Sequence, residues 1–230
     1  MPIFTKILNL EKRVFKDRAY FLWSQLVKAM ANPHRLEIID LLGQAERSVE
    51  DIATESNLSV ANASQHLQQL KKAGLVSIRK EGNYIYYGLA SNEVGKSMTV
   101  LKALAMDNFS EINQLIKDFR KKKNSLESVT ISELIKRMKA GEVILLDVRE
   151  ENEFKAGHIP NALNIPVGKL LGQLKSMDRS MQYIAYCRGP FCVFADEAVQ
   201  LLRKHHFKAF RLEEGFPDWK TKGLPVEVAA

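Results

Sequence analysis

Both cysteines of this 230-residue chain lie five positions apart in the stretch YIAYCRGPFCVFADEAV, residues 183–199. Cys187 follows an apolar run that predicts a buried strand, and Cys192 precedes an amphipathic run that predicts a helix. A loop that ends a strand and opens a helix gathers backbone N–H groups, and the helix dipole directs positive charge to the same place. A thiol held there loses its proton more readily than a free cysteine. Cys187 is therefore predicted to be a nucleophilic thiolate, the alternative being an inert buried cysteine.

The loop after Cys187 is expected to hold an anionic sulfur group through its backbone amides, from residues 188–193. Arg188 is predicted to stabilise the thiolate or a bound anion by its charge. The other residues of this predicted cradle are Gly189, Pro190, Phe191 and Val193. Cys192 has two interpretations, a resolving thiol that attacks a modified Cys187 or a small apolar residue at a helix start.

Residues 126–230 are predicted to form an α/β unit with a mainly parallel sheet, because the short runs VILLDV, YIAYC and AFRL alternate with helical segments such as ISELIKRMKA. Three segments of this half, LLDVREENEFKAGHIPNALNIP (145–166), the strand–cysteine–helix unit and EEGFPDWKTKGLPV (213–226), resemble the rhodanese (sulfurtransferase) fold. The polar residues of the first segment are interpreted as a hydrogen-bonded scaffold and not as catalytic groups: Asp147, Arg149, Glu153 and His158.

The resemblance implies that Cys187 takes a sulfane sulfur from a small donor and passes it to a thiol acceptor through a persulfide. Two departures from the family bear on the donor. The loop has glycine at its third position, Gly189, and lacks the second basic residue associated with thiosulfate, which argues against thiosulfate as donor. Val193 stands where related phosphatases carry an arginine, so a phosphatase is excluded.

The first half of the chain carries nearly all of the net charge of +7, since residues 1–123 hold 19 Lys and Arg against 13 Asp and Glu. Within it, SVEDIATESNLSVANASQHLQQLKKAGLV (48–76) predicts two helices joined by a turn, and LVSIRKEGNYIYYGL (75–89) predicts a β-hairpin. The second helix should expose small and amide side chains of the kind that read base edges in the major groove. The residues predicted to contact DNA are Ser59, Ala61, Asn62, Ser64, Gln65 and Gln68, with Arg79 and Lys80 of the hairpin on phosphates.

This order of elements is a winged helix, and with AMANPHRLEIIDLL (29–42) it resembles the ArsR-type bacterial repressors over about residues 20–118. The resemblance implies a homodimer, paired through its first and last helices, on a palindromic operator in double-stranded DNA. A winged helix used only for protein contacts is the alternative, which the polar recognition face disfavours. Family members often bind metals, but RSVEDIA has no cysteine, and the last helix offers Asp107 and Glu111 but no histidine or thiol. No metal site and no cofactor are expected.

The fold class predicted is a mainly α winged helix-turn-helix domain, residues 1–120, followed by an α/β rhodanese domain with a parallel sheet, residues 126–230. No apolar run approaches the roughly 18 residues that span a bilayer, and two cysteines make no disulfide framework, so a cytoplasmic protein without membrane contact is expected. The function predicted is transcriptional regulation in which Cys187 senses or transfers sulfane sulfur. A sulfurtransferase uncoupled from DNA binding, or a rhodanese-like module that only recruits a partner, are the alternatives.

Overall fold

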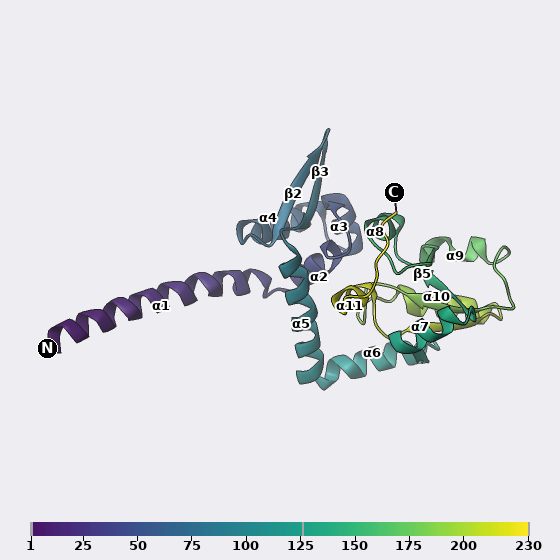
Figure 1. Ribbon diagram of the computed structural model, residues 1–230. Coiled ribbons are helices and arrows are strands. Elements are labelled where there is room, and N and C mark those ends of the chain that lie inside the picture. The colour runs from purple at the N-terminus through teal and green to yellow at the C-terminus, as the bar shows by residue number, and fades with distance from the viewer. Residues whose placement is uncertain (1, 126, 230) are drawn as a thin grey trace. The chain divides into compact units, whose positions relative to one another are not determined.

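The computed structural model describes residues 2–125 and 127–229, which form two compact units with the division between Met98 and Thr99 (Figure 1). The chain passes from one unit to the next within helix α5 (Asn92–Asn108). Helix α6 (Ser110–Lys122), in the stretch before the predicted boundary at residues 120–126, belongs to the second unit. The segment that links the two sequence patterns is therefore structured and packs with the second of them.

The first unit is a winged helix-turn-helix, as predicted. Its sheet is antiparallel in the order β1-β3-β2, and its β2–β3 hairpin turns at Gly82, whose φ of 58° lies in the left-handed region. The elements are α1 (Pro2–Met30), α2 (Pro33–Leu42), β1 (Arg47–Ser48), α3 (Val49–Glu55), α4 (Val60–Lys72), β2 (Val76–Glu81), β3 (Tyr84–Leu89) and the start of α5.

Local signals place helix α4, the second helix of the helix-turn-helix. Asn57 takes a left-handed conformation in the turn, and the Ser59 side chain accepts a hydrogen bond from the Asn62 amide at 3.2 Å, which caps the helix. Along α4, Ala63, Leu67 and Leu70 are fully buried at helical spacing. The opposite face of α4 is left for solvent or a ligand.

The second unit holds a five-stranded parallel sheet in the order β4-β8-β7-β5-β6, which confirms the predicted fold class. Its elements after α6 are β4 (Ser128–Val129), α7 (Ile131–Lys139), β5 (Val143–Asp147), α8 (Glu151–Ala156), β6 (Leu163–Asn164), α9 (Val167–Gln173), β7 (Gln182–Tyr186), α10 (Phe194–Lys204), β8 (Lys208–Leu212) and α11 (Phe216–Thr221).

Strand β7 lies between β8 and β5 and is buried on both faces of the sheet. Tyr183 and Ala185 join one apolar core with residues of α9 and α10, whereas Ile184 and Tyr186 join a second core with residues of α7 and α11. Cys187 continues the first series, so its side chain turns toward the core that α10 covers. It thus stands at the carboxyl end of a central parallel strand, where α/β proteins bind ligands.

Within the part of the chain that the structure describes, no helix combines the length and apolar character needed to cross a bilayer.

Candidate functional site at Cys187

Cys187 lies directly after β7, with only 3% of its surface exposed, and seven residues before the first residue of α10. The loop between them folds back on itself, because the Cys192 amide donates a hydrogen bond to the Gly189 carbonyl at 3.1 Å. The Cys187 thiol faces this turn, with its sulfur 3.5 Å from the carbonyl oxygen of Cys192 and 4.0 Å from that of Gly189. The loop therefore encloses the sulfur, and these two contacts are to carbonyl oxygens. A cradle of backbone amides that holds an anionic sulfur stays a prediction.

Opposing effects set the pKa of Cys187. Burial raises the pKa, but a hydrogen bond with the Cys192 side chain, backbone hydrogen bonds at Gly189 and Ala195, and the positive charge of Arg211 lower it to about 7 in sum. Ala195 belongs to the first turn of α10, so a backbone hydrogen bond at the start of this helix contributes to the lowered pKa of Cys187. A pKa lowered to about 7 favours the thiolate of Cys187, and its role as a nucleophile stays a prediction.

Cys192 is the protonated partner of this pair. Its hydrogen bond with Cys187 and its burial both raise the pKa of Cys192 well above the usual value. Both cysteines are free thiols in the structure. The Cys192 thiol thus donates toward the Cys187 sulfur. The resolving role proposed for Cys192 stays a prediction.

Arg188 forms a buried ion pair with an acid on another element. Its Nε and Nη2 atoms donate to the two carboxylate oxygens of Glu153 in α8 at 2.8 and 2.7 Å, and its guanidinium lies 4.9 Å from the centre of the Phe194 ring. A fully buried carboxylate needs such a counter-charge. The expectation that Arg188 stabilises the thiolate stays a prediction, and Arg211 is the arginine whose charge lowers the pKa of Cys187.

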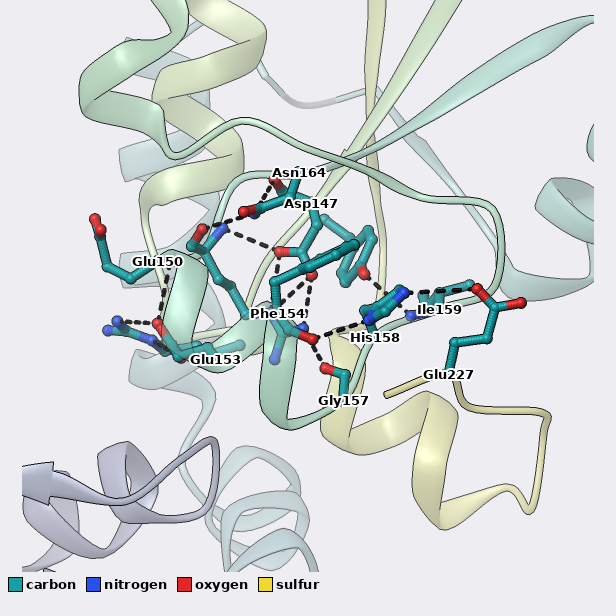
Figure 2. Close-up of polar contacts among 12 residues, drawn as sticks. Asp147, Glu150, Glu153, Phe154, Gly157, His158, Ile159, Asn164 and Glu227 are labelled. Atoms are coloured by element: carbon teal, nitrogen blue, oxygen red, sulfur yellow. Dashed lines mark hydrogen bonds and ion pairs between the residues drawn. The ribbon is translucent and has the colours of Figure 1, made fainter. Parts of the chain in front are cut away.

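Figure 2 shows a hydrogen-bonded brace that includes Asp147, the last residue of β5. Arg149 donates to Asp147 at 2.6 Å and to the Gly157 carbonyl at 2.8 Å, and the side chains of Arg149 and Asp147 are fully buried. Asn164 donates to the carbonyls of Asp147 and Arg149, and the ring of His158 lies 2.9 Å from the Phe154 carbonyl. These polar side chains form the hydrogen-bonded scaffold that the sequence analysis expected. The scaffold lies at the carboxyl end of β5, the strand beside β7.

The loop is also fixed by a close approach of the backbone at Gly215, before α11. A side chain there would lie 2.3 Å from the Gly189 amide nitrogen, a distance that no real Cβ tolerates. The Phe216 amide donates to the Cys187 carbonyl at 3.0 Å, and the Gly215 amide donates to Asp218 at 2.8 Å. The segment before α11 therefore packs directly against the loop that follows β7 and fixes the position of that loop.

The predicted DNA-contacting face of α4 is accessible in the first unit. The residues that are exposed are Ser59, Ala61, Asn62, Gln65 and Gln68, and Ser64 is half-buried. In the wing, Lys80 is exposed, but Arg79 forms ion pairs with Glu46 at 2.6 Å and Glu81 at 2.7 Å. A phosphate contact by Arg79 requires exchange of these partners and stays a prediction.

Asp107 of α5 and Glu111 of α6 are exposed, and among the described residues no three His, Cys, Asp or Glu side chains gather as a metal site.

Comparison with known proteins identifies both units. Residues 32–77 match the family described as bacterial regulatory protein, arsR family, and residues 130–222 match the rhodanese-like domain. The HTH-type transcriptional regulator Rv0324 of Mycobacterium tuberculosis is 39% identical over 203 residues, which cover 88% of this chain and 89% of that protein. The chain belongs to the arsR family of transcriptional regulators and carries a rhodanese-like domain.

Solved structures resemble the two halves of this arsR-family chain separately. A homodimeric winged helix-turn-helix DNA-binding domain from Mycobacterium bovis is 39% identical and covers 40% of this chain and 85% of its own, with a TM-score of 0.39. A rhodanese-related protein from Thermoplasma volcanium is 29% identical and covers 44% of this chain and 97% of its own, with a TM-score of 0.40.

Sequence reasoning missed a group of charged residues at the Cys187 site of this arsR-family regulator. Arg211 and Asp196 are 3% and 2% exposed, and Arg211 Nε lies 3.5 Å from Asp196 Oδ1. A signal for Arg211 existed, because it is the one cation in the otherwise apolar strand run AFRL. Arg120 and Ser125, which also contact Asp196, precede the rhodanese-like match and carried no such signal.

Proposed function

We propose that this arsR-family regulator binds operator DNA as a homodimer through α4 and the β2–β3 wing, in the cytoplasm, and that persulfide formation on Cys187 signals sulfane sulfur to it. The observation that carries the proposal is the enclosed sulfur of Cys187, whose pKa of about 7 makes it a nucleophile at neutral pH. The exposed polar face of α4 supports the DNA contact.

The chemical step is a displacement at sulfur. The Cys187 thiolate attacks the sulfane sulfur of a donor R–S–SH, a bond forms between these two sulfur atoms, and the bond to the donor's inner sulfur breaks. The electron pair of the broken bond leaves with the donor as R–S⁻, and Cys187 becomes a persulfide that retains the transferred proton until it ionises. Backbone amides at the start of α10 and the charge of Arg211 would stabilise the resulting anion.

Two fates are then open to the persulfide. An external thiolate can attack the outer sulfur, which returns Cys187 as a thiolate and completes a sulfur transfer. Alternatively, the ionised Cys192 thiol can attack the inner sulfur, which forms a Cys187–Cys192 disulfide and releases HS⁻. The hydrogen bond between the two thiols supports the second route, although the raised pKa of Cys192 slows it.

The test measures operator affinity of the full chain with and without polysulfide, for the wild type and for Cys187→Ser. We expect polysulfide to change the affinity of the wild type by about fivefold or more, the usual range of allosteric coupling, and to leave Cys187→Ser unchanged. Trypsin separates the two cysteines, because it cuts after Arg179, Arg188 and Arg203, so peptide masses locate the added sulfur. Identical affinities in all four conditions would overturn the sensing function.

The uncoupled sulfurtransferase is the second candidate, and the positive charge of Arg211 at the sulfur favours it because anionic sulfur donors need such charge. In the same experiment it predicts a persulfide on the Cys187 peptide and turnover with added thiol, but no change in operator affinity. Absence of any persulfide would leave the recruitment module instead.

A further inference from the structure

The last turn of helix α6 contacts the Cys187 loop and the start of α10. Arg120 donates from Nη2 to the Pro190 carbonyl at 3.4 Å, and its Nε lies 3.7 Å from Asp196 Oδ1. Pro190 belongs to the loop that encloses Cys187, and Asp196 follows Ala195, whose backbone hydrogen-bonds to the Cys187 sulfur. Arg120 therefore connects the end of α6 both to the loop that encloses Cys187 and to the start of α10.

These contacts form a buried charge cluster centred on Asp196. The Ser125 hydroxyl donates to Asp196 Oδ1 at 2.6 Å, and Arg211 Nε lies 3.5 Å from the same oxygen without a hydrogen-bond partner. Two arginines thus share the carboxylate of Asp196, next to a sulfur atom that becomes an anion. Burial and the neighbouring charge of Arg211 lower the pKa of Arg120, while the negative charges of Asp196, of ionised Cys187 and of Glu213 raise it.

We propose that Arg120 is a positioning residue of the Cys187 site, and that the attachment of the end of α6 to the rhodanese-like unit strengthens when the sulfur on Cys187 is an anion. The inference deepens the proposed function and relies on it only for the choice of Cys187 as the reacting sulfur. A thiolate or persulfide anion attracts the guanidinium, whereas a neutral thiol or a disulfide leaves Arg120 held by Asp196 and Pro190 alone.

The reciprocity of coupled equilibria makes this link measurable from both sides. If Arg120 stabilises the anion on Cys187, the anion must stabilise the docked end of α6 by the same free energy. Because α6 follows α5, through which the chain leaves the winged-helix unit, a change at this attachment alters the segment that joins the two units.

The first measurement is the pH dependence of Cys187 alkylation by iodoacetamide in the full chain, read on the tryptic peptide of residues 180–188. Arg120→Gln should raise the apparent pKa of Cys187 by about one unit, so that the alkylation rate at pH 6 falls about tenfold and the rate above pH 9 is unchanged. Arg120→Lys keeps the positive charge, so the apparent pKa of Cys187 should stay close to its wild-type value. Lys123→Gln is the matched control, since Lys123 ion-pairs with Glu197 of α10 at 3.8 Å and its loss weakens the same attachment.

The second measurement is hydrogen exchange at pH 8 in a peptide that covers residues 117–125. Cys187→Ser removes the anion and should therefore speed hydrogen exchange in this peptide. When Arg120 is already replaced by Gln, the further change Cys187→Ser should alter the exchange rate little. An unchanged alkylation profile in Arg120→Gln, an equal shift in Lys123→Gln, or additive exchange in the double variant would each overturn the proposal. Neither measurement needs a persulfide or DNA, so the failure of the proposed function would be seen separately.

Discussion

At the scale of single residues, the reactivity of Cys187 depends on its neighbours and not on exposure to solvent. Its sulfur is buried, which alone would favour the neutral thiol, yet the thiol of Cys192, the amides of the loop and α10, and Arg211 reverse that preference. The hydrogen bond between the two cysteines therefore lowers the pKa of Cys187 and raises the pKa of Cys192.

Replacement of Cys192 tests the role of this hydrogen bond. Cys192→Ala removes a hydrogen bond to the Cys187 sulfur and should raise the pKa of Cys187 from about 7 by about one unit. Since the thiolate forms as pH rises through the pKa, the alkylation rate at pH 6 should fall about tenfold, with no change well above the new pKa. Cys192→Ser keeps a donor and should shift the profile less. Coincident pH profiles for wild type and Cys192→Ala would contradict this account.

Sequence reasoning found the residues whose signals are local and missed those brought in by the fold. Cys187 and Cys192 were evident from their spacing between a strand and a helix pattern. Arg120, by contrast, lies 70 residues before its partner Pro190, and in the sequence it is only the first cation of a basic run. The amino-acid sequence alone does not distinguish Arg120 from Lys121, which is exposed.

At the scale of elements, the same contrast separates long from short segments. The strands β5, β7 and β8 were evident as apolar runs, and α7 and α10 as amphipathic helices. The strands β4 and β6 have two residues each, too few for any alternation of side chains, so only their pairing with β8 and β5 defines them. The prediction of a parallel sheet was correct because its three central strands carry the signal.

The segment between β8 and α11 should control the shape of the Cys187 loop. Gly215→Ala places a Cβ 2.3 Å from the Gly189 nitrogen, and the neighbour is backbone, which cannot rotate away. We expect a loss of stability of about 2 kcal/mol or more, seen as earlier thermal unfolding of the rhodanese-like unit, together with slower alkylation of Cys187 at pH 7.

Gly172→Ala in α9 is the matched control, because its added Cβ meets no atom within 4 Å. It should leave the unfolding temperature unchanged or raise it slightly, since alanine favours a helix over glycine. Equal unfolding curves for the Gly215→Ala and Gly172→Ala proteins would show that the loop accommodates the extra atom.

At the scale of the whole molecule, the two units carry complementary chemistry. The first offers an exposed polar helix face and no thiol, and the second offers a reactive thiol in a fold without a helix-turn-helix. A regulator gains from this union only if the state of the sulfur changes the free energy of DNA binding. In the proposed function, persulfide formation would lengthen the anionic group on Cys187 near one end of the linking segment, which is the kind of change that such coupling requires.

The exposed apolar side chains of helix α1 bear on the oligomeric state in which the protein binds DNA. It is 29 residues long, and large apolar side chains along its described part are exposed in the single chain, among them Phe15 at 72%, Tyr20 at 64% and Trp23 at 63%. Monomeric proteins rarely leave so much apolar surface in contact with water. A second copy of the chain would cover it and would present two α4 helices to the two halves of a palindromic operator.

Trp23→Glu should therefore convert a dimer into a monomer, because a charge placed in an apolar interface cannot be solvated there. Light scattering after size exclusion would give the mass, and operator affinity should fall more than tenfold because one half-site contact is lost. Gln25→Glu introduces the same charge at an exposed polar position of α1 and should preserve both properties. The contrary result is a Trp23→Glu protein that remains a dimer and binds the operator as the wild type does. That result would exclude α1 from the dimer interface. It would also overturn the inference that the first helices hold two α4 helices together on the operator.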